Sequence, residues 1–459
     1  MADFFRRLQR RFHFWYHSLK PAYALMFGYT FYISVTFIFL CLPVCWNREN
    51  VPLIDSVFMA VSVISTAGLQ TVNTAETYNF FGQCVILIAV QIGGLGYMTV
   101  GSCVILASKG YLPKNRLKVG RAVLAMPEHF DPAVFFRHIV TFTFAIELAG
   151  AVILAFFFWC SGTPHPVWAG VYHSVTAFCT AGFSIFPNNL ESFRSNVPIC
   201  MTVAVIMLLG AIGFIVLDDV CRSVQSKTLR TTLTTRIILA ATFGALFFGT
   251  LVLFFDQNMA AFPIADRLLM AFFQTVSALT TTGFNSIPLN SITVSTAVIG
   301  IVLMILGASP SGTGGGLKST TWSAAIATVL SFLRGHDEIT FFGCTVPPSR
   351  LTAAFASITL YMLTFAVGTY FLLTFEKHPA EDIVFEAASA LGTVGLSRGI
   401  TPELTTAGKL IIMCMMYIGR IGVLSLAVGA VALYHDIAHD DEKTDKDTLP
   451  PAKSDDIVL

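Results

Sequence analysis

Residues 277–285 read SALTTTGFN, and three other stretches of the chain repeat this pattern. They are SVISTAGLQ at 62–70, TAFCTAGFS at 176–184 and SALGTVGLS at 389–397. Aligned on the glycine, each has a threonine two positions earlier, a hydroxyl side chain six earlier, an aromatic side chain ten earlier and a large apolar residue one later. Steps of four residues place the three upstream positions on one face of a helix. The pattern therefore predicts a fourfold internal repeat built on a short helix that ends near a glycine.

Longer apolar runs flank each short helix. Eight of them can cross a hydrocarbon core about 30 Å thick, and they lie near 22–44, 80–107, 134–160, 197–220, 234–256, 293–333, 350–375 and 405–434. The short apolar stretches, near 54–67, 168–181, 268–282 and 383–394, are too short to cross and are typical of re-entrant segments. We therefore predict an all-α integral membrane protein. Four pseudo-symmetric repeats of helix, re-entrant pore loop (P-loop) and helix would surround one central pore.

Composition agrees with this class and excludes others. Of the 459 residues, 55% are hydrophobic and 12% charged, and the mean hydropathy is +0.72. A net charge of +1 argues against nucleic-acid binding, which needs a strongly basic face. The ten cysteines include no CxxC pair, so the sequence suggests neither a zinc site nor a disulfide framework.

The distribution of lysine and arginine predicts the orientation. Sixteen lie in the leader and in the connections near 108–121, 222–236 and 334–350, against five on the opposite side. Because cytoplasmic loops are enriched in these residues, we expect a multi-pass protein of the cell membrane with a cytoplasmic N-terminus and four half-helices that enter from outside. The predicted organisation is a cytoplasmic basic leader (1–21), repeat 1 (22–107), a cytoplasmic linker (108–133), repeat 2 (134–220), a linker (221–233), repeat 3 (234–333), a linker (334–349), repeat 4 (350–434) and a cytoplasmic tail (435–459).

The repeated glycine loops are the candidate ion-binding site. Half-helices that enter from outside point the negative ends of their dipoles inward, which favours a cation, and backbone carbonyls after each helix can replace its hydration shell. The fourth copy also matches the start of the potassium-channel TVGYG filter. We therefore predict K⁺ at the backbone of Gly68, Gly182, Gly283 and Gly395. The full predicted selectivity filter is Thr66, Ala67, Gly68, Thr180, Ala181, Gly182, Thr281, Thr282, Gly283, Thr393, Val394 and Gly395.

The third repeat carries a glycine-rich interruption of its second span. One proline and four glycines within seven residues exclude a continuous helix, and irregular backbone at membrane depth must line protein or water. We predict an intramembrane gating loop at 308–318, below the filter; the alternative is a static kink. The predicted gate residues are Ala308, Ser309, Pro310, Ser311, Gly312, Thr313, Gly314, Gly315, Gly316, Lys318 and Arg420.

Arg420 joins the gate because it aligns with Ala308 and carries a costly charge within a span. Its alternative role is a salt bridge between packed helices. The sequence GTGGGLKS at 312–319 also approaches a nucleotide-binding loop, but Leu317 replaces the second glycine and no strand precedes it. The glycines of QIGGLG (91–96), LLGAIG (208–213) and YIGRIG (417–422) are equally consistent with simple helix packing.

Four other polar sites within apolar segments are expected to have structural roles. We expect Glu147 to pair with a neighbour and Asp218-Asp219 to lie at the cytoplasmic interface. His173 and Glu386 are expected to cap or pack the half-helices rather than to bind a metal.

Four span–loop–span repeats, GFNS in the third loop, the interrupted span and YIGRIG together resemble the Trk/Ktr/HKT potassium transporters. The resemblance runs from about Ala22 to Tyr434 and is closest to the membrane, pore-forming subunit of the bacterial Ktr system. It implies a homodimer with one pore per subunit and a cytoplasmic RCK-type nucleotide-binding ring that controls opening. ATP/ADP or a cyclic dinucleotide would then bind only that partner, with no cofactor in this chain. Glycine rather than serine at position 68 favours potassium, by comparison with sodium-selective HKT members.

The predicted function is potassium uptake driven by the membrane potential. Sodium- or proton-coupled symport is the alternative within transport, although it would need additional buried carboxylates. A membrane enzyme is the alternative from another class, and it would need a catalytic cluster or an ATPase domain. We expect no enzyme activity.

Overall fold

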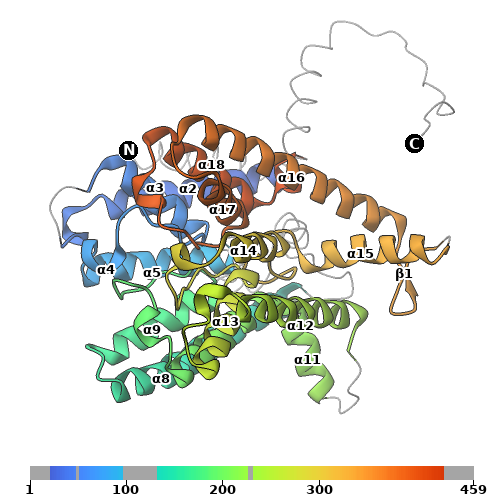
Figure 1. The fold of residues 1–459 in the computed structure, drawn as a ribbon, viewed down its shortest axis with the longest axis horizontal. Coiled ribbons are helices and arrows are strands. Elements are labelled where there is room, and N and C mark those ends of the chain that lie inside the picture. Colours follow the sequence, from blue (N-terminus) through green and yellow to red (C-terminus); the bar gives the residue numbers. More distant parts are fainter. Residues whose placement is uncertain (1–20, 48–50, 97–131, 226–230, 337, 428–459) are drawn as a thin grey trace, which may run out of the picture.

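The computed structural model describes residues 21–47, 51–96, 132–225, 231–336 and 338–427 (Figure 1). The predicted basic leader up to residue 20, most of the linker 108–133 and the tail 435–459 lie outside these ranges, as do most of the cations that predict the orientation. The described chain is mostly helical, and its helices follow the order that the repeat predicts.

The first two repeats occupy the N-terminal half. The first contains α2 (Pro21–Leu40), η1 (Pro43–Cys45), α3 (Leu53–Ile64), α4 (Thr74–Thr77) and α5 (Phe80–Leu95). The second contains α8 (Pro132–Cys160), α9 (Pro166–Phe178), η2 (Glu191–Phe193), α10 (Val197–Ile212) and α11 (Phe214–Gln225).

The C-terminal half repeats this order. The third repeat contains α12 (Leu233–Phe254), η3 (Gln257–Met259), α13 (Ile264–Leu279), η4 (Leu289–Ser291), α14 (Val294–Leu306) and α15 (Ser319–Leu333). The fourth contains α16 (Pro348–Phe375), α17 (Ala380–Gly392), η5 (Thr401–Glu403) and α18 (Thr406–Ile421).

The helices α3, α9, α13 and α17 occupy the positions of the predicted half-helices. Each is 12 to 16 residues long, which is too short for a span of about 20 residues. The repeated aromatic position is fully buried in all four, at Phe58, Tyr172, Phe273 and Phe385. The alignment therefore identifies the face with which these helices enter the core.

Each second helix begins at a side-chain cap, which satisfies free backbone N–H groups. The capping residue also bonds to the end of the first helix or to the residues just after it: Asn79 to the Val44 carbonyl, Asn196 to Ser161, Thr293 to Asp256, and Thr405 to Glu376. The same junction therefore recurs in all four repeats.

The second helix ends at a glycine in every repeat, not only in the third. Backbone φ is +77° at Gly96, +97° at Gly213 and +91° at Gly422, a region that favours glycine. The bend at Gly213 is 95°, so the run predicted as a span at 197–220 is a broken span or a re-entrant loop rather than one straight helix. In the third repeat α14 ends at Leu306 and α15 begins at Ser319, as the predicted interruption requires.

These breaks limit the number of long helices. Within the described ranges, Val134–Cys160, Leu233–Phe254 and Pro348–Phe375 are long and apolar enough to cross a membrane, and the bent pair α10 and α11 would make a fourth. The sequence predicts eight spans, and the breaks at Gly213 and after Leu306 divide two of those runs into shorter helices. Residues 97–107 and 428–434 of two predicted spans also lie outside the described ranges.

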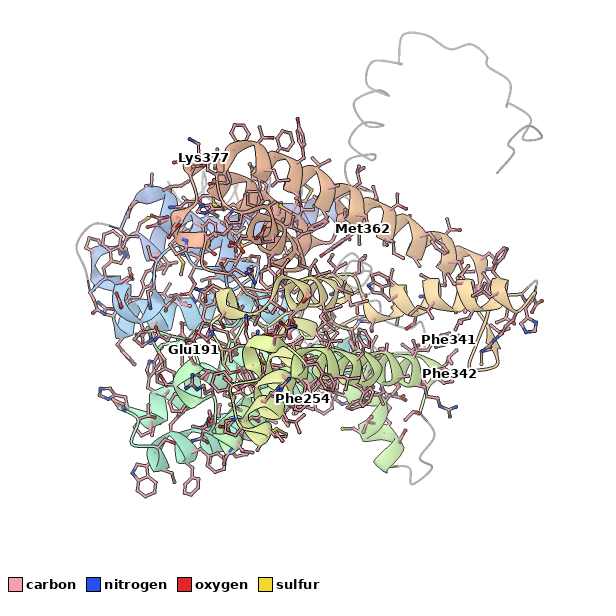
Figure 2. The ribbon with its side chains drawn as sticks, in the orientation of Figure 1. Glu191, Phe254, Phe341, Phe342, Met362 and Lys377 are labelled. Atoms are coloured by element: carbon pink, nitrogen blue, oxygen red, sulfur yellow. The ribbon has the colours of Figure 1, made fainter. Side chains whose placement is uncertain are left out.

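A small hairpin departs from the all-α prediction. Strand β1 (Thr340–Phe341) pairs antiparallel with β2 (Cys344–Thr345) beyond the end of α15. Figure 2 shows Phe341 and Phe342 at this tip of the molecule, and Phe342 is 58% exposed.

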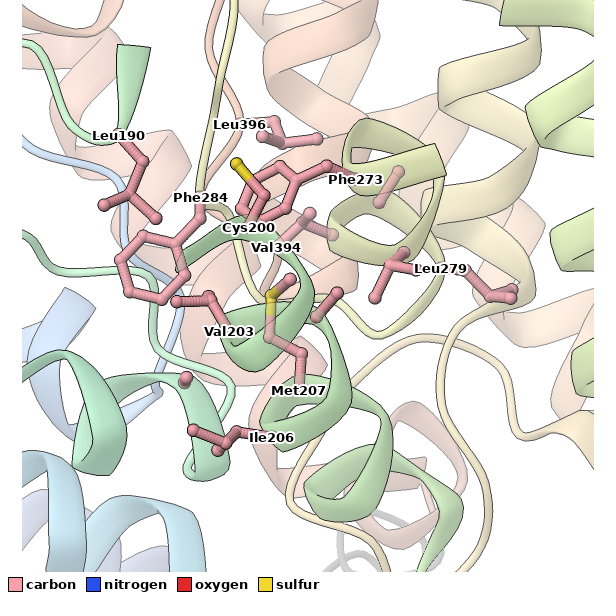
Figure 3. Packing of buried hydrophobic residues seen from close by; sticks show 14 of the residues in the cluster. Leu190, Cys200, Val203, Ile206, Met207, Phe273, Leu279, Phe284, Val394 and Leu396 are labelled. Atoms are coloured by element: carbon pink, nitrogen blue, oxygen red, sulfur yellow. The ribbon is translucent and has the colours of Figure 1, made fainter. Parts of the chain in front are cut away.

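The largest core cluster joins all four repeats. It includes Leu95 of the first, Phe178 and Met207 of the second, Phe273 of the third and Val394 of the fourth. Figure 3 shows Val394 and Met207 within this packing. The chain just before the fourth repeated glycine is therefore held by side chains from other repeats.

Candidate functional site

The four short helices end in the same unusual conformation. The repeated threonine has a positive φ in every copy, 51° at Thr66, 49° at Thr180, 55° at Thr281 and 49° at Thr393. This region is rare for a β-branched residue. The N–H of the following residue donates to the carbonyl five residues back, over 2.8–3.0 Å, and the threonine N–H donates three back, over 3.1–3.2 Å. This is the Schellman arrangement, with threonine where glycine is usual.

The repeated glycines contact one another's loops in a closed cycle. A Cβ added at Gly68 would overlap the Ala181 carbonyl oxygen. The same overlap would occur from Gly182 to Thr282, from Gly283 to Val394 and from Gly395 back to Ala67. Each glycine also has a positive φ, between 62° and 94°. The four loops thus form a ring in which glycine is required for the close approach, and we call Gly68, Gly182, Gly283 and Gly395 the glycine ring.

The hydroxyl position of the repeat supports this ring in two copies. Ser62 Oγ donates to the Leu69 carbonyl over 2.6 Å, and the Gly395 N–H donates to Ser389 Oγ over 3.0 Å. Both bonds tie the segment after the helix back to its last turns. The residues after the glycines are buried as well, at Leu69, Phe183, Phe284 and Leu396.

A hollow of about 230 Å³ lies on one side of the glycine ring. Its lining includes Gly68, Asn189, Asn285, Gly395 and Thr401, so every loop or its continuation contributes. A second hollow of about 230 Å³ shares Asn189 with the first. Burial raises the pKa of nearby Glu191, whose carboxylate accepts a bond of 2.7 Å from Asn285. We call these two hollows the vestibule.

The predicted gating loop contacts the opposite side of the glycine ring, at the threonines. The Gly315 N–H donates to Thr281 Oγ1 over 2.7 Å, and Thr313 Oγ1 donates to the Phe178 carbonyl over 2.8 Å. An added Cβ at Gly315 would overlap Thr393 Oγ1. The loop therefore lies against the carboxyl ends of α9, α13 and α17.

Other bonds hold the loop to the helix break in the second repeat. The N–H groups of Ser309 and Thr313 donate to the carbonyls of Ala211 and Gly210, each over 3.1 Å. Ser311 has a φ of +60° and is buried. The end of α10 at the Gly213 bend, which the sequence did not predict, thus forms part of the surface that the loop contacts.

Two cationic side chains bind adjacent carbonyls of the loop. Arg420 donates to the Thr313 carbonyl over 2.5 Å and to the carbonyls of Gly93 and Gly94, while Lys318 Nζ donates to the Gly314 carbonyl over 2.7 Å. Arg420 thus joins α5, α18 and the loop. No carboxylate among the described residues forms an ion pair with Arg420, so the salt-bridge alternative finds no support there.

The remaining predicted positions are packed into the structure. Glu147 is 5% exposed and accepts bonds from Gln91 and Cys179, as expected of a residue that pairs with neighbours. Asp218 pairs with Arg222 over 2.8 Å. His173 is buried and bonds Ala169 and Ser184, which is a packing role.

Glu386 is also packed, since it accepts a bond from Thr401. Among the described residues no three His, Cys, Asp or Glu side chains gather as metal ligands. The sequence did not identify Asn189 as a site residue. Its position in the vestibule depends on a positive φ of +54°, which only the structure reveals.

Comparisons with known proteins identify the family of the chain. Residues 30–437 match the TrkH family, described as cation transport protein, so the chain belongs to this family. It is 34% identical over 417 residues to Ktr system potassium uptake protein B of Bacillus subtilis, covering 88% of this chain and 92% of that one. It is 31% identical over 426 residues to potassium/sodium uptake protein NtpJ of Enterococcus hirae, covering 89% and 92%.

The fold is also that of a solved member. The potassium transporter TrkH of Vibrio parahaemolyticus superposes with a TM-score of 0.71 at 18% identity, over 90% of this chain and 85% of that one. The predicted family is therefore confirmed. It is a family of transporters rather than enzymes, and with its apolar helices the chain is a multi-pass membrane protein.

Proposed function

We propose that this member of the cation transport protein family takes up potassium across the cell membrane through the glycine ring. The relatives named above are potassium or potassium/sodium uptake proteins. The observation that carries the proposal is the closed cycle of contacts between the four loops. In this proposal the four repeats are pseudo-symmetric about one central pore, and the N-terminus is cytoplasmic.

Selectivity in this proposal comes from backbone carbonyls that replace the water around the ion. The carbonyls of Ala67, Ala181, Thr282 and Val394 each lie against the glycine of the preceding loop in the cycle, which supports the predicted filter. The hydroxyls of Thr66 and Thr393 are buried without a protein partner. Because buried hydroxyls are normally hydrogen-bonded, these two are available to an ion or its water.

The loop at 308–318 acts as the gate in this proposal. Its bonds to Thr281 and Phe178 support a position across the pathway on the threonine side of the ring. Arg420 stabilises the closed position because its guanidinium satisfies the Thr313 carbonyl. Opening would break these bonds, so the gate needs an opening signal.

That signal comes, in this proposal, from a cytoplasmic nucleotide-binding ring that binds a homodimer of this chain. Relatives are named as proteins of a Ktr system, which supports a partner subunit. Any ATP, ADP or cyclic dinucleotide would bind that partner rather than this chain.

Coupled symport is the second candidate, and one observation favours it. Glu147 is a buried carboxylate within α8, with Gln91 and Cys179 as its side-chain partners. If uptake required sodium or a proton gradient and Glu147→Gln abolished that requirement, symport would replace the channel-like proposal.

Rubidium uptake into a cell deficient in potassium uptake tests the main proposal. The wild-type chain should support uptake, and Gly68→Ser should reduce it and admit more sodium, because the added side chain would meet the Ala181 carbonyl. Gly244→Ala in α12 is the matched control, since nothing lies within 4 Å of its added Cβ. Equal rubidium uptake and ion preference in all three proteins would overturn the filter assignment.

A deletion of residues 312–316 tests the gate separately. It should raise the flux of a protein that is present in normal amounts in the membrane. An unchanged or lower flux would contradict the gate.

A further inference from the structure

The vestibule differs in chemistry from the glycine ring beneath it. The ring offers backbone carbonyls, whereas the polar groups that line the vestibule, beside apolar ones such as Leu289, are side-chain amides and hydroxyls, among them Asn189 and Asn285. No acidic side chain lines either hollow among the described residues. A cation that enters would therefore meet neutral oxygens before the ring.

Asn189 is placed at the junction of the two hollows. Its φ is +54°, a conformation that asparagine tolerates better than most residues. The N–H groups of Asn189 and Leu190 donate to the carbonyls of Phe186 and Asn285 over 3.2 and 3.1 Å, so the backbone is fixed. The side-chain Oδ1 is nevertheless buried without a hydrogen-bond partner, an exception that calls for a ligand or water.

Asn285 presents a second amide oxygen with a fixed orientation. Its Nδ2 donates to Glu191 Oε1 over 2.7 Å and to the Ile287 carbonyl over 3.1 Å. Both of these atoms can only accept, so the amide nitrogen must face them. Oδ1 therefore points to the other side, where no described residue donates to it.

We propose that Asn189 and Asn285 form an outer binding site for a partly hydrated monovalent cation, which captures the ion before it enters the glycine ring. This inference rests on the proposed function. Two neutral amide oxygens suit a monovalent ion, because divalent cations are usually bound through carboxylates or keep their water. The site would set the concentration at which uptake saturates, while the ring sets ion preference.

Rubidium uptake measured over a range of external concentrations tests the site. Asn189→Gly removes the amide and keeps a residue that accepts positive φ. It should raise the half-saturating concentration about fivefold, roughly 1 kcal/mol at 1.4 kcal/mol per tenfold, with little change in maximal rate. Asn189→Asp should lower the half-saturating concentration and make uptake sensitive to external Ca²⁺.

The matched control is the neighbouring Asn188, which is exposed and lines neither hollow. Asn188→Gly and Asn188→Asp should both behave as the wild type. If wild-type uptake is normal and the Asn189 variants show the same concentration and Ca²⁺ dependence as it does, the outer site is overturned and the proposed function stands. Absence of rubidium uptake by the wild-type chain would overturn both.

Discussion

The glycine ring and the layer beneath it, which is formed by the ends of the second helices and the loop at 308–318, differ in symmetry. In the ring, four loops share backbone angles, hydrogen bonds and neighbour contacts. In the layer beneath, the second helices of the four repeats end at glycines with different surroundings. Among the described residues, the third continues into the long loop between α14 and α15, and the fourth carries Arg420 just before its glycine. Equivalence suits a site that must surround an ion evenly, whereas a movable obstruction needs one copy that differs.

The largest effect is expected from an added methyl group in the ring. Gly283→Ala combines a positive φ of +91° with overlap onto the Val394 carbonyl. An alanine at positive φ costs about 1–2 kcal/mol before any overlap, so rubidium uptake should fall at least about tenfold. Uptake per molecule at the cell surface is the measurement. Gly300→Ala in α14, whose added Cβ meets only the Phe385 ring at 3.4 Å, should transport normally; equal loss in both variants would break the comparison.

A smaller effect of opposite sign is expected in the layer beneath. Arg420→Ala removes the donor to the Thr313 carbonyl and should raise rubidium flux. A hydrogen bond from a charged group contributes about 1.5–3 kcal/mol, so an increase of about tenfold is expected. Arg350→Ala, at an exposed position in α16, is the control. Normal expression with reduced flux would show that Arg420 supports the pathway rather than its closure.

The seam between the fourth and first repeats should affect stability rather than ion preference. Lys409 Nζ lies 2.6 Å from Asp55 Oδ1, and the two side chains are 12% and 9% exposed. Asp55→Asn leaves a buried lysine unpaired and should lower the unfolding free energy by about 3 kcal/mol. Thermal unfolding in detergent measures this. The double variant Asp55→Asn with Lys409→Met should recover part of the loss. An unchanged thermal unfolding midpoint in the single variant would show that this ion pair does not stabilise the fold.

The smallest effect concerns a junction outside the spans. Burial raises the pKa of Asp256, but hydrogen bonds from Thr296, Thr293 and Asn258 lower it by a larger amount. The net pKa of Asp256 therefore lies below its usual 3.8. A depressed pKa in the folded state stabilises the fold above the unfolded value and loses that contribution as pH falls through the folded value. The thermal midpoint should therefore drop more steeply below about pH 4 than that of Asp256→Asn. Parallel curves would refute this contribution.

Much of the ring could be predicted from the sequence because its four copies are chemically alike. The positions of α3, α9, α13 and α17 follow from columns of aromatic, hydroxyl and glycine residues. The interruption that begins at Gly307 could also be predicted, since a proline and several glycines within a few residues exclude a continuous helix.

The ends of the other second helices at glycine were not predicted, because a single glycine within an apolar run is compatible with a kinked or a straight helix. Gly96, Gly213 and Gly422 align with Pro310 in the third repeat, a signal that was present but ambiguous. The vestibule residues could not be foreseen, since Asn189 acquires its role through a backbone angle and a contact with a loop about a hundred residues away.

The first turn of α11, just after the bend at Gly213, is stabilised by hydrogen bonds to the loop at 308–318. The first two N–H groups of this helix donate to the Ser311 carbonyl and to Ser311 Oγ, over 3.4 and 3.2 Å. A helix begins with N–H groups that have no partner within the helix, and here Ser311 of the loop at 308–318 supplies the acceptors. Withdrawing the loop would uncap α11 at a cost of about 1–3 kcal/mol for each buried group left unmet. In the proposed function the blocked state is therefore the resting state, and opening must be driven by another part of the system before an ion can leave.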